Sequence, residues 1–293
     1  MTSQDETISG IRHYLRSDEA PMTELPDTVI PADELDPALA ASSLTPGGRE
    51  LVRALVRTAR PQLFPGGGLG IEYGALLKTA ARPDLLAGHI AEVVAHLHEP
   101  RIDLLVVPGM SGYPIGAIYS AASGIPAVLL KKSLFPPDDE PERYPPGSFV
   151  IPSYTGGGDT VISADLAAVR DIIAAVIERK RAANGGHLPD LLTLRIAGAD
   201  EIIDKATMAT AITETAPIFC RSVAEELLDS AEFGLEVTVE AWVTPIVKGY
   251  NRSAELLTER FGIVPLAGVT ITSLHLDPPA IGFDGLGVVA VAM

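Results

Sequence analysis

One stretch of the sequence, residues 102–133, constrains the fold more than any other. It contains the apolar run IDLLVVPG, which ends at a glycine, then a segment rich in small residues, and then a second apolar run, IPAVLLKK. Continuous apolar runs of this length are typical of strands buried on both faces, and a helix between two of them predicts parallel pairing. We therefore expect an α/β fold with a mostly parallel, twisted sheet flanked by helices.

The same alternation continues along the chain. Further apolar runs predict strands at 148–154, 191–198, 235–246, 268–276 and 286–293. Helical periodicity predicts helices at 85–99, 115–123, 164–182 and 221–233. No internal repeat is visible at the periods of solenoid proteins, so we expect a layered α/β arrangement.

The charge balance excludes two classes of partner. The 293 residues include 38 acidic and 22 basic side chains, a net charge of -16, whereas nucleic acids and membrane surfaces are polyanions that select basic patches. No apolar run reaches the roughly 18 residues that a membrane span needs. The single cysteine, Cys220, cannot form an intrachain disulfide, and the acidic start MTSQDETISG does not read as a signal peptide, so we expect a cytoplasmic protein.

The glycines between the two apolar runs predict a small anion site. Gly109, Gly112 and Gly116 follow the first strand and enter the helix, so backbone N–H groups and the helix N-terminus would point at one spot. Lys131 and Lys132 end the second run and would bring cations to the same sheet edge, where open α/β folds bind ligands. The alternative is a purely structural turn, because any tight strand-to-helix turn uses glycines.

Taken whole, residues 102–133 resemble the diphosphate-binding region of the type I phosphoribosyltransferases, with the family's Gly-x-x-Gly-x-x-x-Gly turn, helix, Gly-Ile-Pro, strand and basic pair. FPGGGLGIEYG at 64–74 resembles the lead-in of the adenine-type members, and GVTITSLHLD at 268–277 resembles their late strand. The resemblance implies that family's fold, with a small hood for the acceptor.

Two further parts of the chain are defined by this resemblance. It implies a phosphoribosyltransferase-like α/β domain over 61–293, preceded by a helical N-terminal extension over 1–60. The segment around 155–190 is longer than the family usually needs and is interpreted as an insertion.

The activity implied by the resemblance is transfer of ribose 5-phosphate from phosphoribosyl diphosphate to a nitrogenous base, with Mg²⁺ as cofactor and a homodimer as the assembly. The departing diphosphate would be held by Gly109, Met110, Ser111 and Gly112. Lys131 or Lys132 would neutralise its charge, Lys131 as a catalytic cation. The proline-rich segment 133–147 is either a lid that excludes water or a plain surface loop.

The family's second signature is a strand followed by two acidic residues and a Thr-Gly-Gly-Thr type loop. LTLRIAGADEIIDKATMATA matches it best, with Asp200 and Glu201 in the acidic positions that accept hydrogen bonds from the ribose hydroxyls. The loop positions, whose amides would bind the 5′-phosphate, are taken by Asp204, Lys205, Ala206, Thr207 and Met208. Ala206 and Thr207 replace glycines, which leaves the loop less freedom to form a tight amide nest.

Other placements and roles stay open. SYTGGGDT at 153–160 has the glycines of a phosphate loop but lacks the preceding acidic pair. Tyr73 either stacks on the base or packs in the interior. Three histidines on one predicted helix are better explained as solvated positions than as a metal site: His89, His96 and His98.

Two further functions compete with the enzyme. One is a catalytically degenerate, nucleotide-binding regulator of a partner protein, which the altered 204–208 loop favours. The other is an enzyme of specialised metabolism with an unusual acceptor, which the N-terminal extension and the insertion favour. The sequence does not identify the acceptor base.

Overall fold

The computed structural model describes residues 25–63, 69–77, 82–133, 147–152, 159–228 and 234–291. Within these residues the chain forms two compact units. The first contains His96–Asp200 and Thr207–Trp242, and the second contains the remaining described residues. The boundary expected near residue 60 and the insertion around 155–190 stay predictions.

The α/β class and the mostly parallel sheet are confirmed. In the first unit the strand order is β4-β3-β8-β10, and β3 pairs parallel with both β4 and β8. In the second unit the later residues of β10 pair parallel with β11, and β12 and β13 follow as antiparallel neighbours. The strands are β3 (Leu104–Val107), β4 (Ala127–Leu129), β8 (Leu191–Ala199), β10 (Gly234–Lys248), β11 (Leu266–Leu276), β12 (Pro279–Phe283) and β13 (Gly287–Ala290).

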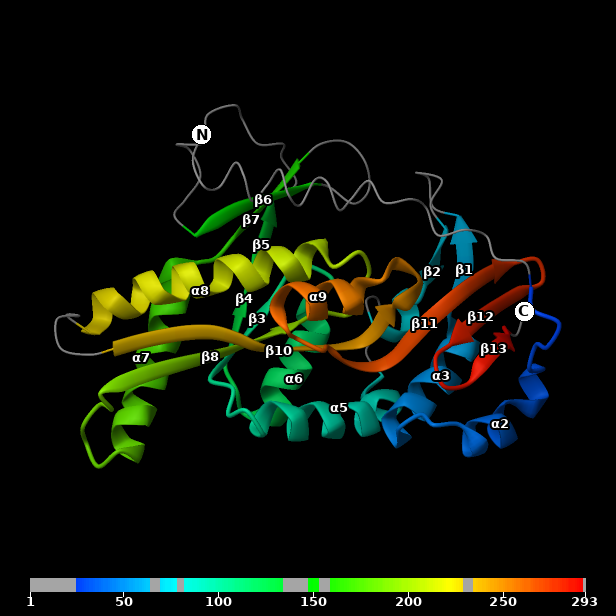
Figure 1. The fold of residues 1–293 in the computed structure, drawn as a ribbon, viewed down its shortest axis with the longest axis horizontal. Coiled ribbons are helices and arrows are strands. Elements are labelled where there is room, and N and C mark those ends of the chain that lie inside the picture. Colours follow the sequence, from blue (N-terminus) through cyan, green and yellow to red (C-terminus); the bar gives the residue numbers. More distant parts are fainter. Residues whose placement is uncertain are drawn as a thin grey trace. The chain divides into compact units, whose positions relative to one another are not determined.

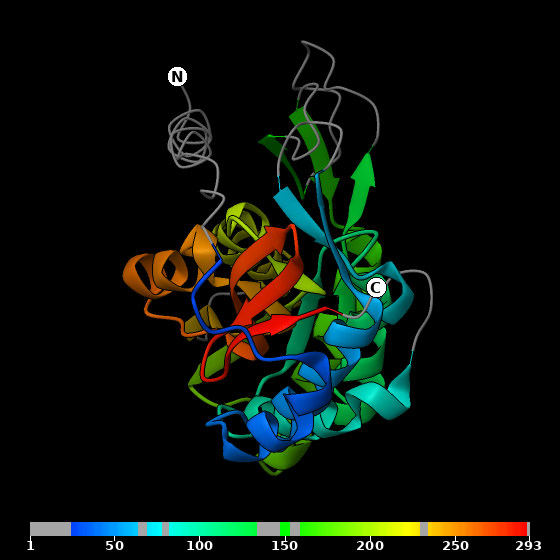
Figure 2. The ribbon, with the colours of Figure 1, turned by 90° about the vertical axis from the view of Figure 1, so that its right-hand side faces the viewer.

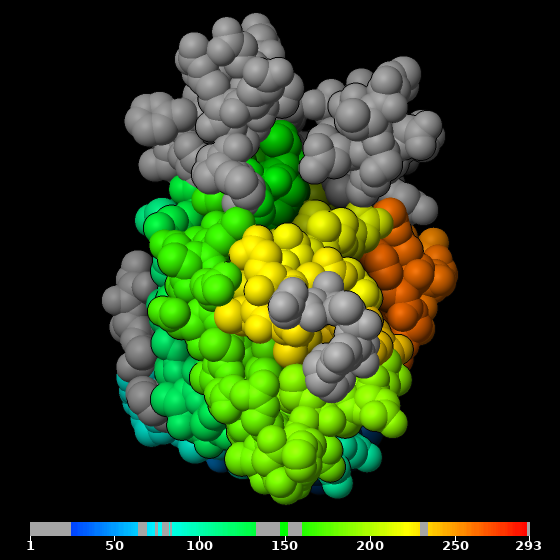
Figure 3. Space-filling model, turned by 90° about the vertical axis from the view of Figure 1, so that its left-hand side faces the viewer, coloured from blue at the N-terminus to red at the C-terminus, as the bar shows by residue number. Residues whose placement is uncertain are grey.

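Helices cover the strands of the first unit (Figure 1). They are α6 (Tyr113–Ser123), α7 (Leu166–Ala183) and α8 (Thr207–Leu228). Helix α6 packs on β3 and β4, α7 on β4, and α8 on β8. Helices α7 and α8 also pack on each other and lie side by side on one face of this unit (Figure 3). The alternation of apolar strands and amphipathic helices thus produces the expected layers.

A separate antiparallel sheet stands out from the first unit in Figure 2. It has the order β5-β7-β6, with β5 at Lys131–Ser133, β6 at Ser148–Pro152 and β7 at Asp159–Ser163. This sheet corrects the expected single strand over 125–132. The parallel ladder ends where the Leu130 N–H donates to the carbonyl of Val107 over 2.8 Å, and the next residues pair with β7 instead.

Two other elements differ from the sequence prediction. The helix expected at 221–233 begins much earlier, since α8 already starts at Thr207 and continues through Pro217. Strand β12 was not expected, because Pro278 and Pro279 mask a short hairpin strand that pairs with β11 and β13. The early start of α8 matters for the site, because it converts the end of the predicted phosphate loop into a helix N-terminus.

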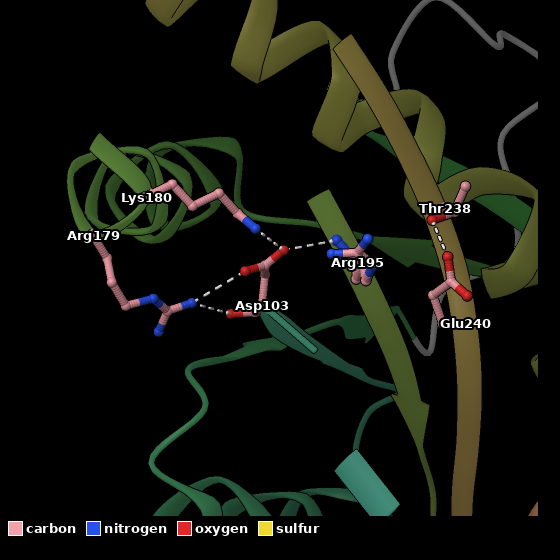
Figure 4. Close-up of polar contacts among 6 residues, drawn as sticks. All are labelled: Asp103, Arg179, Lys180, Arg195, Thr238 and Glu240. Atoms are coloured by element: carbon pink, nitrogen blue, oxygen red, sulfur yellow. Dashed lines mark hydrogen bonds and ion pairs between the residues drawn. The ribbon is translucent and has the colours of Figure 1, made fainter. Parts of the chain in front are cut away.

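A buried carboxylate anchors α7 at the amino end of β3 (Figure 4). Asp103 accepts a hydrogen bond of 2.9 Å from the backbone N–H of Arg195 and forms an ion pair of 2.8 Å with Lys180. The Arg179 guanidinium adds a contact of 3.3 Å. A buried charge needs such partners, so this cluster has a structural role. It lies at the amino end of β3, whereas the candidate ligand position lies at the carboxyl end of this strand.

The second unit contains the N-terminal helices and the late strands. Its elements are η1 (Ala32–Glu34), α2 (Leu35–Ala41), α3 (Pro46–Thr58), β1 (Arg60–Leu63), β2 (Leu69–Glu72), α4 (Gly74–Leu77), β9 (Ile202–Ile203), η3 (Gly249–Asn251), α9 (Ser253–Phe261) and most of α5 (Pro83–His98). Helix α3 packs on β11, and Leu51 and Leu55 on it are fully buried. Thr45 caps α3 by accepting from the Gly48 N–H at 3.0 Å.

None of the helices in the described ranges is both long enough and apolar enough to cross a bilayer.

Candidate functional site

The topology of the first unit selects the carboxyl end of β3 as a ligand position. Strand β4 follows β3 in sequence and lies on one side of it, whereas the next strand of this sheet, β8, lies on the other. The chain therefore reverses its direction of progress across the sheet at β3. Open α/β sheets bind ligands at such a switch point, outside the carboxyl ends of the strands.

The turn after β3 is built by glycines that have no room for a side chain. A Cβ on Gly109 would lie 2.4 Å from the carbonyl oxygen of Leu130 and 2.6 Å from the hydroxyl of Tyr113. That hydroxyl donates to the same carbonyl at 2.6 Å, which ties α6 to the end of β4. At Gly116, a Cβ would lie 2.6 Å from both methyl groups of Val107. Part of the glycine pattern is thus explained by packing.

Asp200 lies against this same turn. The parallel register pairs Val106 with Gly198, so two residues further along Asp200 is level with the start of the turn. A Cβ on Gly112 would lie only 2.8 Å from the Asp200 Oδ1 atom. The structure therefore brings together a glycine turn and a carboxylate that stand almost ninety residues apart in the sequence.

The remaining turn residues differ in exposure. Met110 is 63% exposed, Ser111 is partly buried, and the peptide bond between Gly109 and Met110 is cis. The backbone of Met110–Gly112 precedes α6, whose first turn carries no acidic side chain. An anion at this position would meet the positive end of the helix without a competing carboxylate on that helix.

Lys131 lies next along this edge but points at a protein carboxylate. Its side chain is 68% exposed, and its Nζ atom lies 3.4 Å from Oδ2 of Asp165. Asp165 caps α7 by accepting from the N–H groups of Ala167 and Ala168, and these contacts together with Lys131 lower the pKa of the carboxyl. An exposed pair of this length is weak, so Lys131 is available to a stronger anion. Lys132 is partly buried in β5.

The second predicted acid, Glu201, is placed in the second unit. It is 3% exposed, and its Oε1 atom accepts a hydrogen bond of 3.4 Å from the Tyr73 hydroxyl. Tyr73 is itself buried, so its ring packs in the interior of this unit. The two consecutive acids thus have different surroundings: Asp200 borders the glycine turn, and Glu201 is enclosed.

The predicted phosphate loop has an unexpected conformation at Ala206. This residue has φ 56°, in the left-handed region that glycine ordinarily occupies. Lys205 is partly buried, and Thr207 and Met208 open α8, whose first turn has no acidic residue. The loop therefore has a glycine-like backbone geometry at Ala206.

Asp204 is held by two residues that the sequence did not indicate. Its Oδ2 atom pairs with Lys248 Nζ at 2.6 Å, and its Oδ1 atom accepts from Asn251 Nδ2. Lys248 ends β10 and is almost fully buried. A signal for it was present, because the apolar run AWVTPIVK ends in lysine as the run before Lys131 does.

Three further features of the sequence are the single cysteine, a possible metal site, and the segments proposed as a lid and as a competing loop. Cys220 is buried, which raises the pKa of its thiol to about 12, so it remains protonated and a poor nucleophile. Within the described ranges, no three His, Cys, Asp or Glu side chains gather in a way that could hold a metal ion. The proposed lid over 133–147 falls almost entirely on residues 134–146, and the competing loop mostly on 153–158; both lie outside the described residues.

Comparison with known proteins gives structural neighbours only. No protein-family model and no curated protein sequence matches the chain. Among solved structures, the chain is similar to adenine phosphoribosyltransferase from Trypanosoma brucei in complex with AMP, pyrophosphate and ribose-5-phosphate, at 11% identity over 78% of this chain and 81% of that one, with a TM-score of 0.47.

Two further neighbours are the corresponding enzymes from Giardia lamblia and Saccharomyces cerevisiae. The first has 14% identity over 75% of this chain and 97% of that one, with a TM-score of 0.46. The second has 17% identity over 76% and 98%, with a TM-score of 0.45.

Proposed function

We propose that this chain is a phosphoribosyltransferase that transfers ribose 5-phosphate from phosphoribosyl diphosphate to a nitrogenous base and releases diphosphate. The observation that carries the proposal is the approach of Asp200 to the glycine turn, 2.8 Å from the Cβ position of Gly112, at the switch point of the sheet. In this position Asp200 would accept hydrogen bonds from the ribose hydroxyls of a substrate whose diphosphate lies at the turn.

The residues at this edge suit the bond changes of the reaction. The bond between ribose C1 and the diphosphate oxygen breaks, the electron pair leaves with diphosphate, and a nitrogen of the base bonds to C1 and loses its proton. The amides of Met110–Gly112 would stabilise the negative charge that develops on diphosphate. Lys131 would leave its ion pair with Asp165 and pair with the diphosphate instead. Asp200 would bind the ribose hydroxyls and stabilise the positive charge that develops at C1.

The donor set fits Mg²⁺ that arrives with the substrate. Mg²⁺ prefers oxygen ligands, keeps several waters and is often held by one or two carboxylates plus substrate phosphates. Asp200 supplies a partly exposed carboxylate at the turn, and the described residues offer no larger cluster of metal ligands. When bound, the ion would neutralise the diphosphate. We propose the loop over Asp204–Met208 for the 5′-phosphate, with Lys205 and Thr207 as side-chain donors.

A non-catalytic nucleotide-binding regulator is the second candidate. It is favoured by the enclosure of Glu201 beside Tyr73, because a buried acid does not meet ribose hydroxyls in this arrangement. Diphosphate release from phosphoribosyl diphosphate, measured with a panel of purine and pyrimidine bases, separates the two functions. The enzyme releases diphosphate with at least one base, whereas a regulator binds and releases none.

The role of Asp200 gives the mutational test. The variant Asp200→Asn should lose turnover by at least 100-fold and keep the circular-dichroism spectrum of the wild type, since the substitution preserves shape. The loss corresponds to about 2.7 kcal/mol of transition-state stabilisation. Wild-type turnover in this variant would refute the role assigned to Asp200.

A further inference from the structure

The best-built polar cluster of the second unit joins the end of β10 to the segment after β8. Lys248 and Asp204 form an ion pair of 2.6 Å whose side chains are 6% and 16% exposed. Asn251 in η3 donates to the other oxygen of the same carboxylate. Ser253, at the start of α9 (Figure 1), donates to the carbonyls of Ile203 at 3.3 Å and Lys248 at 3.2 Å. The cluster therefore fixes both the side chain and the backbone beside Asp204.

Both oxygens of the Asp204 carboxylate are thus engaged within the protein. A carboxylate held by a lysine and an amide is fixed in orientation, and the lysine supplies its counter-charge. An aspartate in this state is a poor ligand for phosphate, so its role differs from that of the amides that follow it. The sequence alone assigned all five loop residues to phosphate binding.

The next residues explain why the charge of Asp204 has to be cancelled. Ala206 lies two residues further along with φ 56°, and α8 begins at Thr207 with no acidic residue in its first turn. A left-handed residue before a helix turns successive amides toward one point, which attracts an anion. An uncompensated carboxylate two residues away would repel a phosphate dianion and oppose that attraction.

We propose that Lys248 and Asn251 are positioning residues for the 5′-phosphate loop. They neutralise and orient Asp204 without touching the phosphate, so that the loop backbone can accept a dianion. This inference rests on the proposed function, because it presupposes that the Asp204–Met208 segment binds the 5′-phosphate of phosphoribosyl diphosphate.

The test is calorimetric titration of the full-length protein with ribose 5-phosphate, which carries the 5′-phosphate but no diphosphate. Lys248→Met should weaken binding at least tenfold, because Asp204 keeps its hydrogen bond from Asn251 but loses its counter-charge. Asp204→Asn should bind as tightly as the wild type or several-fold tighter, because the site gains net positive charge. The double variant Asp204→Asn, Lys248→Met should bind ribose 5-phosphate with a dissociation constant within about threefold of the wild-type value.

The double variant separates charge compensation from mere structural support. If the pair only braces the loop, the double variant binds as weakly as Lys248→Met, and the proposal is overturned. A loss of at least tenfold in Asp204→Asn would overturn it too, because Asp204 would then be a direct ligand. Circular dichroism at the titration temperature checks that each variant is folded. If Lys248→Met is unfolded, Asp204→Asn and the double variant decide the question.

Arg252→Gln is the matched control for loss of one positive charge. Arg252 lies four residues after Lys248, is 69% exposed and pairs with Glu259. This variant should bind ribose 5-phosphate within twofold of the wild type, and a tenfold loss would show that net charge alone explains the effect of Lys248.

Titration of the wild type with phosphoribosyl diphosphate and Mg²⁺ distinguishes failure of the proposed function from failure of this inference. Failure of the wild type to bind overturns the proposed function, whereas binding without rescue in the double variant overturns only this inference.

Discussion

The glycine turn of the first unit and the Glu201–Ala206 segment of the second unit are built by opposite means. In the turn, backbone groups approach so closely that Gly109 and Gly112 have no room for a Cβ. In the segment, buried side chains are paired with partners from distant parts of the chain, as Asp204 is with Lys248. The turn is therefore sensitive to added atoms, and the segment to lost charges. Substitutions that change one property at a time test this contrast.

The largest expected effect is the difference in stability lost when Lys248 and Lys131 are each replaced by methionine. Lys248→Met should lower the free energy of unfolding by about 3–5 kcal/mol, because it leaves the Asp204 carboxylate without its buried counter-charge. Lys131→Met should cost less than about 1 kcal/mol, because its pair with Asp165 is exposed. Urea unfolding of both variants measures the two values. Equal losses would remove the distinction between the two regions.

A second difference concerns pH. His89 on α5 is buried in the second unit, and desolvation lowers the pKa of its imidazole from 6.5 to about 4. The unfolded chain takes up this proton at a higher pH than the folded chain, so stability is complete above about 6.5 and is lost as the pH falls toward 4. The full loss from this group is about 3 kcal/mol.

The variant His89→Gln should show a shallower decline of stability between pH 6.5 and 4 than the wild type, measured by urea unfolding at several pH values. His98→Gln, at an exposed position on the same helix, is the matched control. Hydrogen exchange should show that the loss begins in the second unit. A decline of the same steepness in His89→Gln would contradict the assignment.

The smallest expected effect on stability comes from relieving the left-handed backbone conformation of Ala206. Ala206→Gly should raise the free energy of unfolding by about 0.5 kcal/mol, since glycine relieves a backbone cost of about 1–2 kcal/mol but loses more chain entropy on folding. Ala209→Gly, three residues later inside α8, should instead lower it by about 1 kcal/mol. Thermal unfolding of the pair reports the opposite signs. A loss of stability in both variants would show that Ala206 is not strained.

Local patterns carried most of the fold prediction. The apolar runs and glycine stops predicted β3, β8, β10 and β11, because strands buried on both faces need continuous apolar sequence. The split of 125–132 into β4 and β5 was not predictable, since it depends on Lys131 and its neighbours pairing with β7 instead of continuing the parallel ladder. Strand β12 was missed because its flanking prolines read as loop.

The candidate site was predictable only where it is continuous in sequence. The glycine turn and Asp200 were found because each follows an apolar strand, and parallel pairing of β3 and β8 places them together. The partners of Asp204 were missed because Lys248 and Asn251 lie more than forty residues away and meet it only through tertiary packing. The left-handed φ at Ala206 was missed because alanine seldom adopts it.

Calorimetric titration with phosphoribosyl diphosphate and Mg²⁺ tests whether the glycine turn beside Asp200 binds the substrate. The wild type should bind with a stoichiometry of one per chain, and Gly112→Val should abolish binding, because its side chain would collide with Asp200 at the turn. Gly185→Ala, at a glycine with open space around its Cβ position, should bind as the wild type does, although its φ of 69° makes the alanine cost about 1–2 kcal/mol of stability. Absence of heat from the wild type at millimolar ligand, or unchanged binding in Gly112→Val, would contradict the account.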